Sequence, residues 1–220
     1  MSADASHRDL PGVGRLLSLS DGVVAIALTL LVLQLKVPSL PASDQTSASE
    51  LARRLGDGAD QLISYLISFF VIAQFWLAHY RVFRQVAGQR EGLAWWNFAF
   101  LLTITVMPFT SELLGTYSEN PLAVAIFAVN LLFASLATQA TMLFGRRNDL
   151  LIKETDHRAL RAGQARSAAS VLVICLSIGL AWVNTSAAKY CWLLLIVAPW
   201  AADHWSARRV PAGPTASPPA

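Results

Sequence analysis

The chain has 220 residues, of which 55% are hydrophobic and only 14% are charged, and its mean hydropathy is +0.47. This composition excludes an ordinary soluble domain and predicts that most of the chain lies in a membrane. The net charge is +3, but the basic residues are spread along the chain, which argues against a nucleic-acid partner.

The first apolar stretch, from Arg15 to Lys36, holds one internal charge, Asp21. About 20 apolar residues at roughly 1.5 Å per residue span a bilayer core of ~30 Å, so a transmembrane helix is predicted over about 15–37. A secretory signal peptide is the alternative, but its apolar region is usually only about 7 to 15 residues long and ends at a cleavage site that is missing here. A carboxylate within a membrane helix usually faces protein or water, which makes Asp21 a candidate functional residue.

Residues 1–14 are predicted to form a short N-terminal tail, and 207–220 a disordered C-terminal tail. The segment between them, 15–206, is predicted to be one all-α transmembrane domain of six helices. Ser47 and Glu50 have the spacing of a capping box, which predicts a short extramembrane helix from Ala48 to about Leu55. After the first helix, the expected transmembrane helices cover about 61–80, 93–117, 122–144, 167–183 and 189–205.

The distribution of basic residues predicts the orientation of the chain. With six helices, thirteen of the 17 lysines and arginines fall on one side of the membrane, and the other side holds Lys36, Arg53, Arg54 and Lys189. The positive-inside rule then places both termini in the cytoplasm of a multi-pass protein of the cell membrane.

Sequence motifs for catalysis are missing. The chain has no H-E-x-x-H, G-x-S-x-G or P-loop motif and no paired-cysteine metal site, so we expect neither an enzyme nor a metal or cofactor. The TVGYG filter of ordinary potassium channels is also missing, as is a voltage sensor with arginine at every third position.

Three stretches carry a resemblance to a known family. Arg15 to Asp21 resembles the R-x-x-x-F-S-D signature that opens the first helix in bacterial relatives of the endolysosomal potassium channel, the transmembrane protein 175 family. Leu19 stands where the family usually has Phe. The stretches Ser68 to Phe83, with a W-x-x-H ending, and Trp95 to Phe109, with its asparagine and Pro-Phe, resemble the second and third helices, so the resemblance covers roughly the first half of the chain.

The resemblance implies a potassium-permeable channel, a homotetramer in membrane lipid with the first helix of each subunit lining a central pore. At the positions that match the family, Ile26, Leu30 and Leu33 would form apolar constriction rings, and Thr29 beside them would contribute to selectivity. The permeant potassium ion would be the only ligand. Without the resemblance, the stripe that Ile26, Leu30 and Leu33 form is more typical of packing against lipid or protein than of a pore lining.

A polar cluster is predicted near the cytoplasmic end of the bundle. Asp21, His79 and Asn97 should lie at one depth in the first three helices, with Arg15 and Ser20 close by. A structural role in fixing the first helix is the favoured interpretation. Two other functions stay open: a proton-linked carrier in which Asp21 and His79 relay protons, and a non-conducting membrane scaffold.

Overall fold

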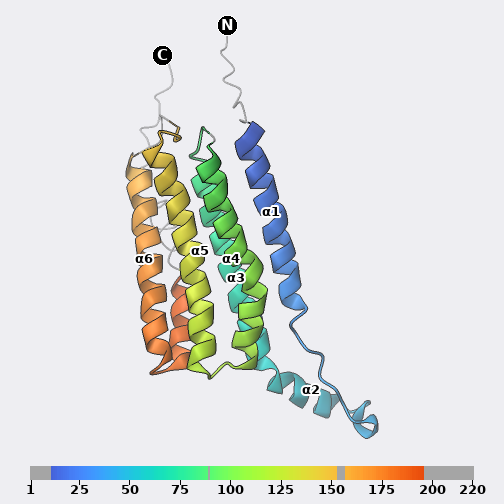
Figure 1. The fold of residues 1–220 in the computed structure, drawn as a ribbon. Coiled ribbons are helices and arrows are strands. Elements are labelled where there is room, and N and C mark those ends of the chain that lie inside the picture. Colours follow the sequence, from blue (N-terminus) through green and yellow to red (C-terminus); the bar gives the residue numbers. More distant parts are fainter. Residues whose placement is uncertain (1–10, 89, 153–156, 196–220) are drawn as a thin grey trace, which may run out of the picture.

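The computed structural model describes residues 11–88, 90–152 and 157–195, and these form an antiparallel bundle of long helices (Figure 1). Residues 185–195 form a further helical segment after the last of these elements. The elements in chain order are α1 (Pro11–Val32), η1 (Ala42–Asp44), α2 (Ala48–Asp57), α3 (Ala59–Phe83), α4 (Glu91–Thr116), α5 (Pro121–Arg147) and α6 (His157–Ala181).

Five helices, α1, α3, α4, α5 and α6, are long and apolar enough to cross a membrane. The prediction of an all-α membrane protein is therefore confirmed. The predicted sixth span, 189–205, falls only partly on described residues: the helical segment begins at 185, where Asn184 Oδ1 accepts from the N–H of Ala187 over 2.9 Å, and 196–205 lie outside the described residues.

The boundaries of α1 differ from the prediction at both ends. The helix begins at Pro11, inside the segment 1–14 that was expected to be a tail, because proline in a first turn gives up no helical hydrogen bond. It ends at Val32 rather than near 37. Beyond Val32 the chain tightens through i to i−3 bonds, and Gln34 Nε2 donates to the carbonyl of Pro108 in α4.

The start of α6 also differs from the prediction. The fifth helix was expected at 167, and α6 begins at His157. Residues 157–166 are rich in alanine and arginine, which favour helix without being apolar. A prediction based on hydropathy therefore starts this helix too late.

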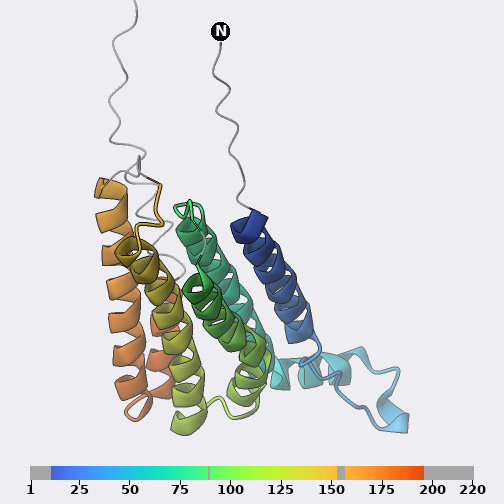
Figure 2. The ribbon, with the colours of Figure 1, turned by 45° about the horizontal axis from the view of Figure 1, so that its top comes forward.

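The helices lie side by side with α1 at one edge of the bundle and α6 at the opposite edge (Figures 1 and 2). We call the end where α1 begins and α5 ends the basic end, because exposed arginines gather there: Arg84, Arg90, Arg146 and Arg147. At the other end, α2 projects from the foot of the bundle on the side of α1 and buries no residue of its own. Its N-cap is as predicted, since Ser47 Oγ accepts from the N–H of Glu50 over 3.3 Å.

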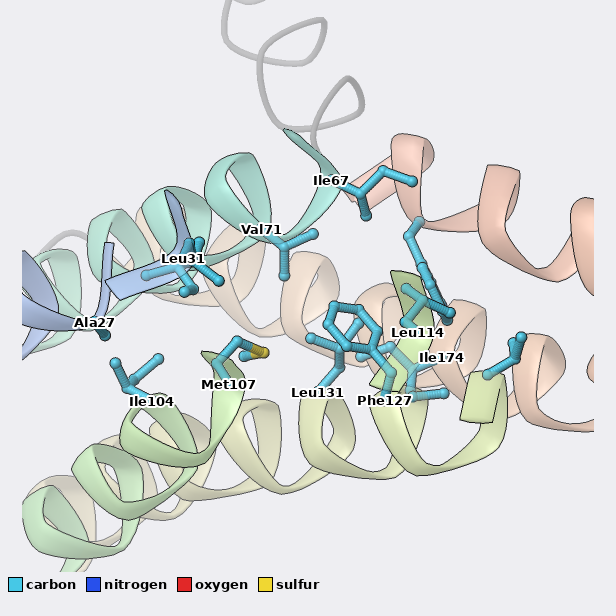
Figure 3. Packing of buried hydrophobic residues seen from close by; sticks show 14 of the residues in the cluster. Ala27, Leu31, Ile67, Val71, Ile104, Met107, Leu114, Phe127, Leu131 and Ile174 are labelled. Atoms are coloured by element: carbon cyan, nitrogen blue, oxygen red, sulfur yellow. The ribbon is translucent and has the colours of Figure 1, made fainter. Parts of the chain in front are cut away.

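Apolar side chains from all five long helices fill the centre of the bundle. Figure 3 shows Ala27 and Leu31 of α1 beside Ile104 and Met107 of α4, with Val71 of α3 facing them. The outside of the bundle is apolar too, and its large exposed side chains include Trp95, Leu102, Phe109 and Leu172. An apolar exterior of this kind suits contact with lipid acyl chains.

Two connections meet at the basic end. The α3–α4 loop pairs with the α5–α6 loop through an isolated antiparallel bridge between Val86 and Leu151, and Ala87 N–H donates to Leu150 O over 2.7 Å. A second apolar cluster lies beneath this bridge and contains Leu16 of α1. The first turns of α1 are thus packed against both loops.

Candidate functional site

One face of α1 is held against the bundle. Its buried side chains recur every three or four residues, as expected for a helix stripe, and α1 contacts both α3 and α4. Each of these side chains is at most 9% exposed. They are Leu16, Ser20, Val24, Ala27 and Leu31.

The opposite face of α1 carries the residues that the sequence predicted for a constriction. Ile26 is 60% exposed, and Leu30, on the flank of this face, is 44% exposed. Leu33, predicted to lie within the helix, is 76% exposed in the turn just after α1 ends at Val32. Thr29 is exposed between them, and its Oγ1 donates to the carbonyl of Ile26 over 2.8 Å. Gly22 lies one turn before Ile26, and no atom lies within 4 Å of where its Cβ would be. We call Gly22, Ile26, Thr29, Leu30 and Leu33 the open face of α1.

Three members of the predicted polar cluster do meet. Ser20 Oγ lies 3.1 Å from Asn97 Oδ1, and His79 Nε2 lies 2.7 Å from the same oxygen, so the amide of α4 joins α1 to α3. All three residues are at most 1% exposed. The His79 ring stacks on the ring of Phe100 and lies tilted against that of Phe83, with both ring centroids 4.4 Å away. This packing fixes the depth at which α1 sits against the bundle.

The hydrogen bonding of this cluster is not saturated. Asn97 Nδ2 and His79 Nδ1 are buried and have no partner among the described residues. The Ser20 hydroxyl has one proton and two acceptors within reach, the carbonyl of Leu16 at 2.8 Å and Asn97 Oδ1. If the amide of Asn97 is rotated by 180°, its Nδ2 can donate to both Ser20 and His79, which resolves this competition.

Asp21 and Arg15 lie apart from the triad. The Asp21 carboxylate accepts from Trp76 Nε1 over 2.8 Å and is otherwise exposed on α1. Arg15 is exposed and has no hydrogen bond or ion pair with a described residue. The partner of Asp21 is therefore Trp76, one helical turn before His79 on α3. The W-x-x-H spacing, which puts both rings on one side of α3, was the available signal.

Metal binding has no support in the described ranges, where no three His, Cys, Asp or Glu side chains lie close enough to hold an ion. The site instead consists of helix α1, one face of which is packed against the bundle through apolar side chains and the buried amide of Asn97. The other face of α1 is exposed and carries apolar and hydroxyl side chains. Such a helix can line a conduit only where copies of it face one another.

The bundle defines a multi-pass helical membrane protein, and comparison with known proteins places it in a family of channels. Residues 15–108 match the family model described as the endosomal/lysosomal potassium channel TMEM175. A potassium channel of Streptomyces collinus is 32% identical over 176 residues, which cover 78% of this chain and 83% of the relative. The chain belongs to the TMEM175 family.

Two other relatives are more distant or much longer. The human endosomal/lysosomal proton channel TMEM175 is 32% identical over 115 residues, 52% of this chain but only 22% of that protein. The crystal structure of a lysosomal potassium-selective channel TMEM175 homolog from Chamaesiphon minutus matches with a TM-score of 0.72 at 23% identity, over 91% of this chain and 100% of that chain. The structural match shows the fold. Because the family consists of ion channels, the expectation that the chain is not an enzyme is confirmed.

Proposed function

We propose that four copies of the chain surround a central pore lined by α1 and conduct potassium ions passively across the cell membrane. Potassium is proposed as the permeant ion because bacterial relatives are named potassium channels. The tetramer is proposed because the resemblance of the sequence to the family implies one. In this proposal the permeant ion is the only ligand, and no cofactor takes part.

The observation that carries the proposal is the difference between the open face of α1 and the exposed face of α4. The exposed side chains of α4 are mostly large and apolar, such as Trp95 and Phe109, and its exposed Thr105 lies among them. The open face of α1 differs because it includes a glycine, Gly22, beside its own exposed Thr29. Small and hydroxyl residues suit close approach of helices and contact with water rather than acyl chains.

The constriction follows from the spacing of three side chains. Ile26, Leu30 and Leu33 are four and three residues apart, the 3.5-residue period that keeps one seam facing the axis of a left-handed bundle. Four copies would stack as apolar rings along about 10 Å, the first two on α1 and the last in the turn just after it. A ring narrow enough to exclude water resists ions by dewetting, and it opens when the helices tilt and the ring widens.

In this proposal, the preference for potassium over sodium comes from the cost of removing water from the ion at the apolar rings, and Thr29 contributes to it. Apolar rings offer no oxygen to replace the hydration shell, and potassium sheds its water at lower cost than sodium. Because Thr29 Oγ1 gives its proton to the Ile26 carbonyl, its lone pairs stay available to a passing cation. The variant Thr29→Val should conduct and lose part of the preference for potassium.

For orientation, we propose that the basic end faces the cytoplasm and α2 lies outside. The exposed Arg84, Arg90, Arg146 and Arg147 support this by the positive-inside rule. An impermeant thiol reagent applied to intact cells should label Ser43→Cys and spare Asn148→Cys. Labelling in the opposite pattern contradicts the orientation.

The carrier alternative gains no support from the cluster. Asp21 bonds to the indole of Trp76 and His79 to the amide of Asn97, so no direct hydrogen bond joins the two titratable groups. Neither an indole nor an amide N–H loses its proton near neutral pH. This arrangement favours a structural role for both residues.

Planar bilayers with potassium on one side and sodium on the other test the proposal, after reconstitution of the full chain. A potassium-selective channel gives unitary currents and a reversal potential displaced from zero. Saturable flux without unitary currents, abolished in an assembled His79→Gln protein, would support the carrier instead.

A further inference from the structure

A long apolar groove runs between α4 and α5 on the outside of the bundle. The groove is part of a larger cavity of about 1490 Å³, which residues of α3 and α6 also line. Ala99 of α4 and Ala140 of α5 are its half-buried small residues, and Leu102, Phe133 and Leu143 stand exposed around them. Small residues between large ones leave a groove in the surface rather than a ridge.

The length of the groove matches one leaflet of a bilayer. From Phe133 to Leu143, α5 advances ten residues, or about 15 Å at roughly 1.5 Å per residue. That is half of a hydrocarbon core of ~30 Å. The groove therefore extends from near the middle of the membrane to its surface at the basic end.

Two cationic groups, Arg90 and Arg147, lie past the surface end of this groove, outside the residues that line the cavity itself. On α5, positions 133, 136, 140, 143 and 147 follow one another by three or four residues, so Arg147 continues the groove-lining stripe. Arg90, just before α4, donates from Nη1 to Asn148 Oδ1 over 3.1 Å, which holds its guanidinium beside the end of α5. Both arginines are exposed, and neither forms an ion pair with a described carboxylate, although Glu91 and Asp149 are their neighbours in sequence.

Aromatic groups lie at the same level. Trp95 is 72% exposed and Trp96 is 42% exposed, and both are in the second turn of α4. Tryptophan is enriched where acyl chains give way to headgroups. Gly92 of α4 lies directly against the ring of Phe144 of α5, which sets the ends of the two helices at one height.

We propose that an anionic glycerophospholipid of the leaflet at the basic end binds in this groove. Its phosphate binds the guanidinium groups of Arg90 and Arg147, and one acyl chain packs against Ala99 and Ala140. Basic residues at the membrane surface between helices recognise anionic headgroups in this way. The proposal holds whether or not α1 lines a pore.

Native mass spectrometry of the purified full chain tests it, with phosphatidylglycerol and phosphatidylcholine of identical acyl chains as probes. We expect at least tenfold tighter binding of phosphatidylglycerol. Arg147→Gln should remove most of that preference, whereas Arg146→Gln, with the same charge change one residue and about 100° away around α5, should keep it. Ala140→Phe should weaken the binding of both lipids, because the ring fills the groove.

Three results would overturn the proposal. Equal losses in Arg146→Gln and Arg147→Gln would show diffuse attraction to a basic surface. An unchanged affinity in Ala140→Phe would show that no acyl chain lies in the groove. Disulfide cross-linking of Leu136→Cys between two copies in the membrane would show that a second copy covers it.

Discussion

The indole of Trp76 on α3 donates a hydrogen bond to the carboxylate of Asp21 on α1 over 2.8 Å. One turn further along α3, His79 holds Asn97, which in turn contacts Ser20, the residue before Asp21. Two successive residues of α1 are thus tied to the bundle by two rings of α3, one directly and one through α4. These ties leave the other side of α1 open.

The Trp76 bond predicts an order among variants at Asp21. An amide at this position still accepts from the indole, whereas Ala and Trp76→Phe both remove the bond. Because hydrogen bonds to charged groups are stronger than neutral ones, Asp21→Asn should lower the unfolding free energy less than Asp21→Ala. Trp76→Phe should cost about 1 kcal/mol. Thermal unfolding in detergent measures all three, and an Asn variant as unstable as Ala would contradict the assignment.

Asn97 is predicted to position α1 as well as stabilise the fold. Asn97→Ala leaves Ser20 and His79 without their buried partner and should cost about 2–3 kcal/mol. The control is Asn130→Ala, which removes another buried asparagine whose Nδ2 donates to Thr103 O over 3.1 Å but which bonds no residue of α1. Only Asn97→Ala should expose Val24→Cys to a thiol reagent. Equal labelling in both backgrounds would reduce Asn97 to a general packing role.

The contact of Gly92 with Phe144 predicts a specific double-mutant effect. A Cβ at Gly92 would overlap the ring of Phe144, so Gly92→Ala should destabilise the protein by about 1–3 kcal/mol through overpacking. Phe144→Leu in the same chain should recover much of this loss. Gly179→Ala is the control, because no atom lies within 4 Å of its added Cβ, and it should be neutral or stabilising by up to about 1 kcal/mol. Additive effects of Gly92→Ala and Phe144→Leu would contradict the contact.

The ion pairs of α2 predict its behaviour at low pH. Hydrogen bonds from Arg53 and Arg54 lower the pKa of Glu50 to about 2 from its ordinary 4.5. A carboxyl with a lowered pKa contributes stability above its unfolded pKa, and this contribution disappears as the pH falls from about 4.5 towards 2. A spin label on exposed Ser49→Cys should gain mobility over that range and not between pH 5 and 8. Glu50→Gln should remove this dependence of label mobility on pH. If the dependence persists in Glu50→Gln, another titrating group causes it.

The sequence was sufficient to predict five of its six expected spans, in their order, because each is a long apolar run. The sixth lies partly outside the described residues. It misplaced the start of α6, since the helix from His157 begins in residues that favour helix but not lipid. It missed the bridge between Val86 and Leu151, because a single pair of residues from two loops has no periodicity to detect.

In the candidate site, depth was predictable and partners were not. Ser20, His79 and Asn97 meet as expected, because three antiparallel helices place them at one level. Asp21 lies at the same level, but its direction around α1 turns it to Trp76. Depth follows from counting residues, whereas the direction of a side chain depends on the rotation of each helix, which packing decides.

Thiol block of single-channel current tests the central claim, that the open face of α1 lines the pore. In a chain whose Cys175 and Cys191 are replaced by Ser, Ile26→Cys is compared with Leu172→Cys of α6, because the two native side chains are 60% and 61% exposed in the single chain. A pore lined by α1 predicts that a charged thiol reagent blocks the current of Ile26→Cys and leaves that of Leu172→Cys unchanged. Block of neither variant, or of both alike, would contradict it.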